Sequence, residues 1–198
     1  MGTIFTIGHS TQTLESFLAL LAANGVEAIA DVRSEPFSGR NPEFNRGLLR
    51  ASLAAHGVAY VFLGRELGAR PRDDAMYRGE RVSYDLLATT PRFRDGLARV
   101  REGASRFRLA ILCAEGDPLF CHRSLLIARR LTDDGEDVIH LHPDGHSETQ
   151  GDAMQRLLTL YNLPARDVFG RQEELLQQAS ARQEGRIAFR RAKASVDR

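Results

Sequence analysis

LAILCAEGDPLFCHRSLL, residues 109–126, joins an apolar run to a dense group of reactive side chains. Residues 109–112 have the length and composition of a buried strand, and a turn follows at residues 116–118. A helix is predicted from Cys121 to about residue 131. In open α/β sheets, ligands bind beside the carboxyl ends of the strands. This stretch therefore predicts both an α/β fold and the place of its site.

The rest of the chain alternates between strand and helix patterns, which predicts a three-layer αβα fold around a mostly parallel sheet of about five strands. Two irregular segments interrupt it, at residues 34–44 and 64–83, and a loop as long as the second is usually a lid, a binding loop or a mobile segment. The strands are expected at residues 3–7, 26–32, 58–63, 109–112 and 136–142. The main helices are expected at residues 13–24, 45–55, 84–87, 90–100, 121–131, 151–161 and 172 onward.

Two domains are expected, an α/β domain at residues 1–165 and a helical C-terminal tail at residues 166–198. The tail is rich in Glu, Gln, Ala and Arg, and it either docks on the core or forms a homodimer through its helix. Its basic end, residues 190–193, is expected to be solvated or to contact nucleic acid.

Composition restricts the class of protein. The formal net charge of +1 selects neither nucleic acid nor a membrane surface, and no apolar run reaches the roughly 18 residues of a membrane span. Two cysteines do not make a disulfide framework, so a cytoplasmic protein is expected. Lys193 is the only lysine, and arginine suits bidentate binding of phosphate or carboxylate.

Cys121 is the leading catalytic candidate, because a helix N-terminus and the adjacent His122 and Arg123 favour a thiolate. Cys113 is more easily read as a small core residue. The full set of catalytic candidates is Cys121, His122, Cys113, His9 and Glu115.

Polar residues after other strands supply candidates for substrate binding. Arg33, Arg40 and Arg123 can together bind an anion, although Asp31 and Arg33 can instead form an internal ion pair. Phe37 and Phe44 can stack a base or anchor their loop to the core. The predicted binding residues are Ser10, Asp31, Arg33, Arg40, Asn41 and Arg123, and His142, Asp144 and His146 follow the fifth strand.

Three chemistries compete at the cysteines. Nucleophilic catalysis would use Cys121 or Cys113 with His122 or His9 as base. A metal site would use the same four residues, but C-x7-C-H is not a standard zinc spacing, so no metal ligand is assigned. Redox pairing of the two thiols lacks the C-x-x-C pattern of thiol oxidoreductases.

Six motifs in this order resemble the bacterial and archaeal family catalogued as domain of unknown function 488, over about residues 3–145. The C-terminal sequence at residues 186–190 also resembles the tail of that family. The resemblance implies an α/β three-layer fold and leaves the activity and any cofactor open. The motifs are residues 6–10, 31–33, 41–45, 67–68, 113–115 and 121–123.

The leading hypothesis is an enzyme that acts on an anionic, nucleotide- or phosphate-like substrate through a Cys/His/Arg site. One alternative is a non-catalytic nucleic-acid-binding module that uses the Arg40 loop and the basic tail, whose affinity would fall steeply with salt. The other alternative is a Cys/His metal-binding protein.

Overall fold

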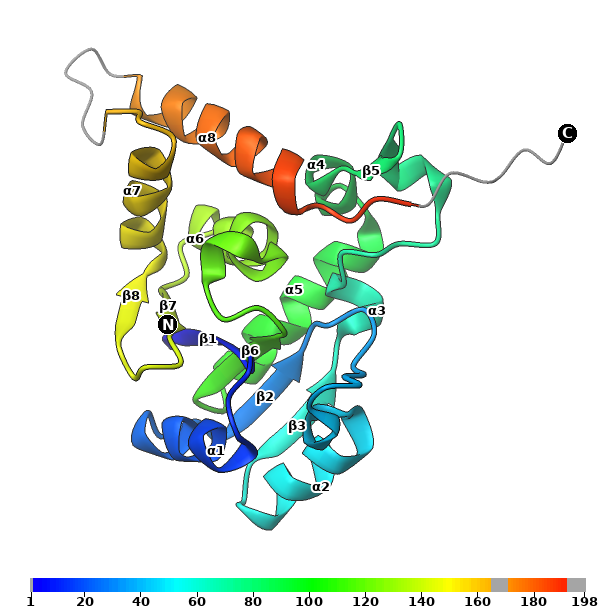
Figure 1. Cartoon of the computed structure of the whole chain (residues 1–198), viewed down its shortest axis with the longest axis vertical. Coiled ribbons are helices and arrows are strands. Elements are labelled where there is room, and N and C mark those ends of the chain that lie inside the picture. The colour runs from blue at the N-terminus through cyan, green and yellow to red at the C-terminus, as the bar shows by residue number, and fades with distance from the viewer. Residues whose placement is uncertain (1, 165–170, 192–198) are drawn as a thin grey trace, which may run out of the picture.

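A six-stranded sheet forms the middle layer of the computed structural model, which describes residues 2–164 and 171–191 (Figure 1). Its strand order is β3-β2-β6-β1-β7-β8. The first five of these strands are parallel to one another, and β8 pairs antiparallel with β7. The strands are β1 (Ile4–Gly8), β2 (Ala28–Asp31), β3 (Ala59–Phe62), β6 (Leu109–Cys113), β7 (Val138–Leu141) and β8 (Ser147–Thr149). The predicted fold class is confirmed, with six strands rather than five.

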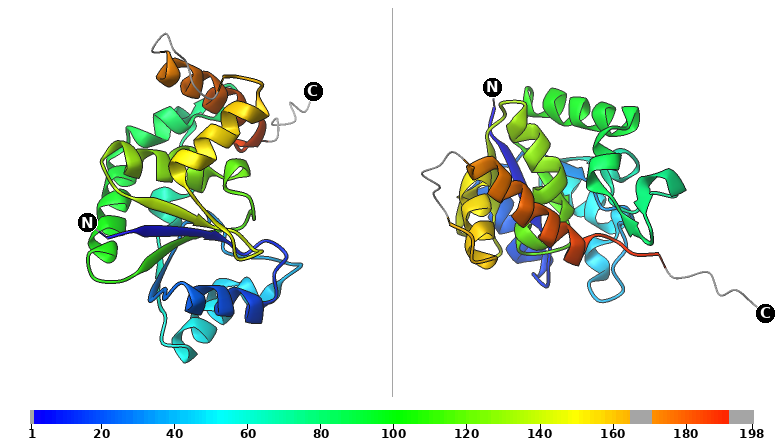
Figure 2. Two further views of the ribbon diagram at one scale, coloured as in Figure 1. Left: turned by 90° about the vertical axis from the view of Figure 1, so that its left-hand side faces the viewer. Right: turned by 90° about the horizontal axis from the view of Figure 1, so that it is seen from above.

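Helices cover both faces of the sheet (Figure 2). On one face, α1 (Leu14–Ala23) and α2 (Arg46–Ala55) bury Phe17 and Leu49 against Ile7 and Leu112. The other face is covered by α5 (Pro91–Ala104), α6 (Arg129–Asp133) and α7 (Gln150–Leu160). Since both faces are covered, every residue of β1 and β6 is buried, which explains their apolar runs.

Helix starts follow the local capping rules in most places. Thr13 and Thr90 accept hydrogen bonds from backbone N–H groups of the first turns of α1 and α5, and Thr149 forms a capping box at α7. Asn45, expected to cap α2, occupies the cap position without a capping hydrogen bond. Its Oδ1 atom instead accepts from the backbone N–H of Ser38 at 2.6 Å and so orders the preceding loop.

The prediction of an irregular segment at residues 64–83 is wrong. This segment contains α3 (Gly64–Leu67), a 3₁₀ turn (Asp74–Met76) and a hairpin of β4 (Tyr77–Arg78) with β5 (Arg81–Val82), and α4 (Tyr84–Ala88) follows it. A further 3₁₀ turn, Pro42–Phe44, lies in the other loop. Elements this short carry too few residues to show a hydrophobic period.

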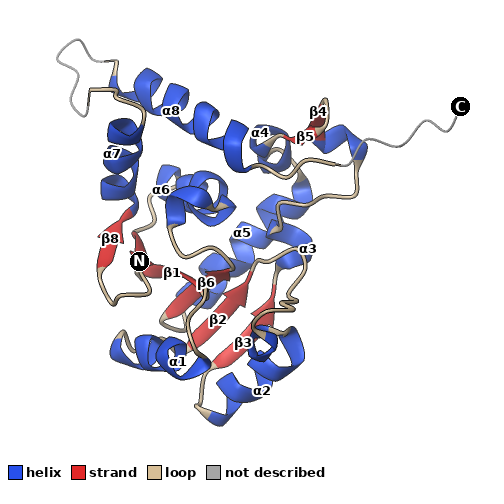
Figure 3. Cartoon of the chain, in the orientation of Figure 1, coloured by secondary structure: helices blue, strands red, loops and turns tan. Residues whose placement is uncertain are grey.

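The long C-terminal helix α8 (Gln172–Ile187) docks on the core, lying across α7 (Figure 3). Gln183 is fully buried, where its Nε2 donates to the Leu119 carbonyl at 2.7 Å and its Oε1 accepts from the Tyr161 hydroxyl at 2.8 Å. The predicted domain boundary at residue 165 and the basic-end residues 192–193 lie outside the described residues. None of the described helices has the length and apolar character that a membrane span needs.

Gly8 lies where a side chain cannot fit, because a Cβ atom there would overlap the carbonyl oxygen of Glu115. We expect Gly8→Ala to lower the free energy of unfolding by about 1–3 kcal/mol through overpacking. Gly47→Ala is the matched control, since nothing lies within 4 Å of its added Cβ and it should stabilise α2 by about 0.5–1 kcal/mol. Urea unfolding measures both variants, and equal effects would contradict this account of Gly8.

Candidate functional site

The carboxyl ends of β1, β2 and β6 lie at one edge of the sheet, because Gly8 pairs with Cys113 and Asp31 with Leu112. A hollow of about 260 Å³ opens beside this edge. Seven of the residues singled out from the sequence line it, namely His9, Arg33, Phe37, Cys113, Glu115, Cys121 and His122. Segments more than one hundred residues apart in the chain therefore converge at one place.

Arg123 holds the loop between the two cysteines in place and does not line the hollow. Its side chain is fully buried, and its Nη2 donates to the Gly116 carbonyl at 2.7 Å. Its Nη1 donates to the Glu115 carbonyl, and its Nε donates to the Thr6 hydroxyl at 3.3 Å. The structure thus gives Arg123 a positioning role, while direct contact with an anion remains an untested prediction.

A π-helical turn (Arg123–Ala128), which continues into α6, follows Cys121. The sequence predicts a plain α-helix here, yet such π turns occur frequently at functional sites. The backbone N–H of Arg123 donates to the Cys121 sulfur at 3.4 Å. The sulfur therefore lies at the helix start, where unpaired N–H groups favour negative charge.

Cys113, Cys121 and His122 form a compact cluster in the wall of the hollow. The Nδ1 atom of His122 lies 3.6 Å from the Cys113 sulfur and 3.9 Å from the Cys121 sulfur. The Cys113 thiol also lies 3.2 Å from the Glu115 carboxyl. All three potential ligand atoms of the cluster lie within 4.8 Å of one another, and both cysteines are free thiols.

The two thiols have opposite electrostatic environments. A hydrogen bond to Cys121 and burial raise the pKa of the Cys113 thiol well above its usual value. Burial alone would also raise the pKa of Cys121, but the hydrogen bond from Cys113, the Arg123 guanidinium and His122 outweigh it and hold that pKa well below its usual range. The cluster therefore favours one proton on Cys113 and a thiolate at Cys121.

The negative charge of that thiolate shifts the pKa values of His122 and Glu115. Burial would lower the pKa of His122, but its hydrogen bond to the Cys121 sulfur and the charge there raise it. Burial first, and then the same negative charge, raise the pKa of the Glu115 carboxyl. The residue is exposed as a whole, whereas its carboxyl is crowded by the cysteine loop. The Nε2 atom of His122 is buried without a hydrogen-bond partner among the described residues.

Asp31 and Arg33 form the internal ion pair that the sequence left as an alternative. Their side chains make two hydrogen bonds, of 2.9 Å and 2.6 Å, and both are buried. Arg33 Nη1 also donates to the Phe44 carbonyl at 2.9 Å, and the Tyr60 hydroxyl donates to Asp31. Arg33 is therefore a rigid, buried arginine in the wall of the hollow, and its charge is paired with that of Asp31.

His9 stacks on the buried Phe44 ring at 4.5 Å, so Phe44 anchors its loop. Burial and the charge of Arg33 lower the pKa of His9, which favours the neutral imidazole. Ser10, Arg40 and Asn41 do not line the hollow. The Asn41 amide donates to the Ser10 carbonyl at 3.2 Å and joins two loops, and Arg40 is exposed.

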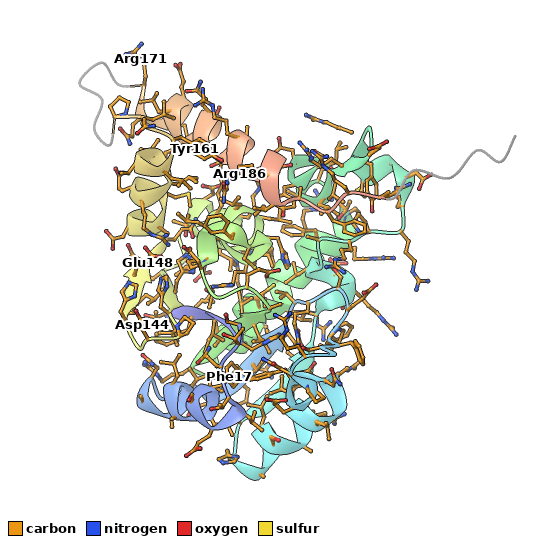
Figure 4. All side chains as sticks on the ribbon, in the orientation of Figure 1. Phe17, Asp144, Glu148, Tyr161, Arg171 and Arg186 are labelled. Carbon is orange, nitrogen blue, oxygen red and sulfur yellow. The ribbon has the colours of Figure 1, made fainter. Side chains whose placement is uncertain are left out.

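His142, Asp144 and His146 form a separate group on the β7–β8 hairpin (Figure 4 labels Asp144). His142 contacts Glu148 at 2.8 Å, and Arg156 bridges Glu148 to Asp117 in the cysteine loop. This group braces the loop from outside, and it does not line the hollow.

Sequence reasoning missed a buried polar chain behind the site. His140 contacts the Thr6 hydroxyl through Nδ1 and the Gln150 amide oxygen through Nε2, at 2.7 Å each. Thr6 in turn accepts from Arg123. The only sign of this chain in the sequence is a histidine within an apolar strand. The partners of His140 come from distant segments, so the sequence does not reveal them. Arg70, Phe120 and Phe189, which also line the hollow, were missed for the same reason.

Comparison with known proteins gives one match. A family model described as domain of unknown function DUF488 matches residues 13–130, which is more than half of the chain. This range includes both cysteines, whereas His9, Ser10 and the C-terminal helix fall outside it. No curated protein and no solved structure matches the chain.

The buried position of His140 predicts a pH dependence of stability. Burial, with a smaller effect of Arg123, lowers the pKa of His140 from 6.5 to about 4. Between these values the unfolded chain binds a proton that the folded chain excludes, so this contribution is present above pH 6.5 and is lost as the pH falls towards 4. The upper limit of the loss is about 3 kcal/mol.

Urea unfolding at several pH values measures this loss. His140→Gln should flatten the dependence of unfolding free energy on pH, whatever its effect on absolute stability. His56→Gln, at an exposed position, is the matched control. An unchanged slope in His140→Gln would show that other groups cause the pH dependence.

Proposed function

The chain belongs to the family described as domain of unknown function DUF488, and we propose that it is an enzyme acting on an anionic substrate through its Cys/His cluster. The observation that carries this proposal is the position of the Cys121 sulfur. It accepts a backbone N–H at a helix start, lies beside His122 and forms part of the wall of the hollow, where only 1% of the residue is exposed. A thiol so placed is activated as a nucleophile.

The reaction proposed is nucleophilic substitution. The Cys121 thiolate attacks an electrophilic carbon or phosphorus atom, a bond from sulfur to that atom forms, and the bond to the leaving group breaks with its electron pair. Glu115, whose pKa is raised by burial and whose carboxyl lies 3.2 Å from the Cys113 thiol, is the proposed proton donor to the leaving group. Water then attacks the same atom, its proton passes to the Glu115 carboxylate, and the bond to sulfur breaks, which restores both the thiolate and the acid. His122 stabilises the thiolate before and after the reaction.

Two arginines on the walls support an anionic substrate, although each is paired with a carboxylate, Arg33 with Asp31 and Arg70 with Glu35. Arg33 and Arg70 line the hollow, and the Arg70 side chain is half exposed. In this proposal Arg33 and Arg70 bind the anion, while Arg123 and Asn41 keep the loops in place and Arg40 is not required. Cytoplasmic location is part of the proposal, since free thiols such as Cys113 and Cys121 fit a reducing compartment.

A metal centre is the second candidate, and the spacing of the cluster favours it. Tetrahedral zinc bound by sulfur at about 2.3 Å and nitrogen at about 2.0–2.1 Å separates those ligand atoms by roughly 3.6 Å. The observed sulfur to nitrogen distances of 3.6 Å and 3.9 Å are close to this value. Two cysteines and one histidine would leave a fourth position for water or substrate, as catalytic zinc sites do.

The nucleic-acid alternative has less support. Arg191 in the predicted basic end forms an ion pair with Asp74 and lies 3.4 Å from the Tyr77 ring centre, so it packs on its own chain. Self-association through α8 remains a prediction that no observation tests.

Alkylation tests the thiolate. We expect iodoacetamide to modify Cys121 about tenfold faster than free cysteine near neutral pH, because a larger fraction of the thiol is ionised. Peptide mass spectrometry measures the rate at each cysteine. In the Cys121→Ser variant, Cys113 should react more slowly than free cysteine. A Cys121 rate no higher than that of free cysteine would remove the activated nucleophile.

Elemental analysis tests the metal candidate. Protein purified without a tag should then carry about one zinc ion per chain, as expected for a three-ligand catalytic site. Cys113→Ser and Cys121→Ser should each lose the ion. Loss of the ion from such a variant does not by itself distinguish a missing ligand from misfolding. His142→Ala is therefore the control that should keep it. Folded, metal-free wild-type protein would eliminate this candidate and leave the thiolate enzyme.

A further inference from the structure

Exposed aromatic rings gather at the mouth of the hollow. The structure has six exposed large apolar side chains among its described residues, and three of them, Phe37, Phe120 and Phe189, line this one hollow. They come from the loop after β2, from the cysteine loop and from the segment after α8. Scattered exposed apolar residues are ordinary, whereas a cluster at a cavity indicates a binding surface.

A cation accompanies these rings. The Arg70 guanidinium lies 5.1 Å from the centre of the Phe189 ring, and Nη1 is 3.5 Å from the Glu35 carboxylate. Both side chains of this ion pair are at least half exposed, at 52% and 75%. Such a pair contributes little stability, so an anionic ligand can replace Glu35 as the partner of Arg70 at small cost. The Arg70 backbone is held by its N–H bond to Ser34.

We propose that the hollow binds a planar aromatic anion of the nucleoside monophosphate class, with its base on the phenylalanine rings at the mouth and its phosphate at Arg70 and Arg33. This proposal rests on the enzyme proposed above and names its substrate class.

The size of the hollow supports this orientation. Its volume of about 260 Å³ is below the roughly 300 Å³ at which ordinary ligand pockets begin. It accommodates a phosphate between Arg33 and Arg70 and leaves the base on the rings at the mouth. Phe37, with 75% of its surface exposed, gains most from being covered by a ring.

Calorimetric titration of the whole chain with AMP tests the proposal, with ribose 5-phosphate and adenosine as partial ligands. AMP should bind more tightly than either partial ligand. Phe37→Ala and Phe189→Ala should each weaken AMP binding about tenfold, as expected for loss of one stacking partner, and leave ribose 5-phosphate unaffected. Arg70→Gln should weaken both phosphates. Phe107→Ala removes a ring that is also exposed, at 44%, but does not line the hollow, and it should change nothing.

AMP binding no tighter than that of ribose 5-phosphate, or equal effects of Phe37→Ala and Phe107→Ala, would overturn the proposal. If Phe189→Ala does not fold, Phe37→Ala still tests the proposal, because the Phe37 side chain is highly exposed and its loss should not affect folding. Titration of Cys121→Ser separates this proposal from the enzymatic one. AMP binding that persists there, with an unreactive Cys121 in the wild type, leaves an aromatic anion site without thiolate chemistry. A reactive Cys121 without AMP binding leaves an enzyme for another substrate.

Discussion

The buried guanidinium of Arg123 is the interaction on which the rest of the site depends. A charged group without exposure to water is tolerated only when hydrogen bonds compensate its lost hydration. Arg123 obtains them from the carbonyls of Glu115 and Gly116 and from the Thr6 hydroxyl. These bonds draw the cysteine loop over the end of β1, and the missing side chain of Gly8 provides the space. The same residue thus fixes the loop geometry and stabilises negative charge at Cys121.

The position of the loop determines the chemistry of the two thiols. Both sulfurs lie close to the same imidazole nitrogen, the Nδ1 atom of His122. Loss of a thiol proton and binding of a metal ion would therefore both involve these three atoms. Burial gives these interactions more strength than they would have in water, because the local dielectric is low. The Nε2 atom of His122 is buried and has no hydrogen-bond partner among the described residues.

The hollow is formed by two kinds of segment, the ends of regular elements and loops. The floor comes from strand ends and the helix start, whose backbone hydrogen bonds hold the reactive groups rigidly. The mouth comes from the loop after β2 and from the segment after α8, which pairs with β5 through the Val82 and Phe189 backbones. In many proteins a rigid scaffold positions the loops, and the loops carry residues that contact a ligand.

Much of the fold was predictable from the sequence because parallel strands buried on both faces leave continuous apolar runs, and helix starts leave capping residues. These patterns are local, so they predicted the sheet class, the edge of the sheet at which the hollow opens, and four residues that line it, Cys113, Cys121, His122 and His9. They missed β8 and the β4–β5 hairpin, because strands of two or three residues have no detectable period.

The order of residues along the chain is enough to show which reactive side chains are present and at which edge of the sheet they lie. Their burial and their partners depend on the folded chain, because the contacting groups come from distant segments. Folding paired Arg33 with Asp31, placed Arg123 behind the loop, and brought Phe189 and Arg70 to the mouth. Spacing along the chain does not encode such contacts, since folding sets the distances between segments that are far apart in sequence.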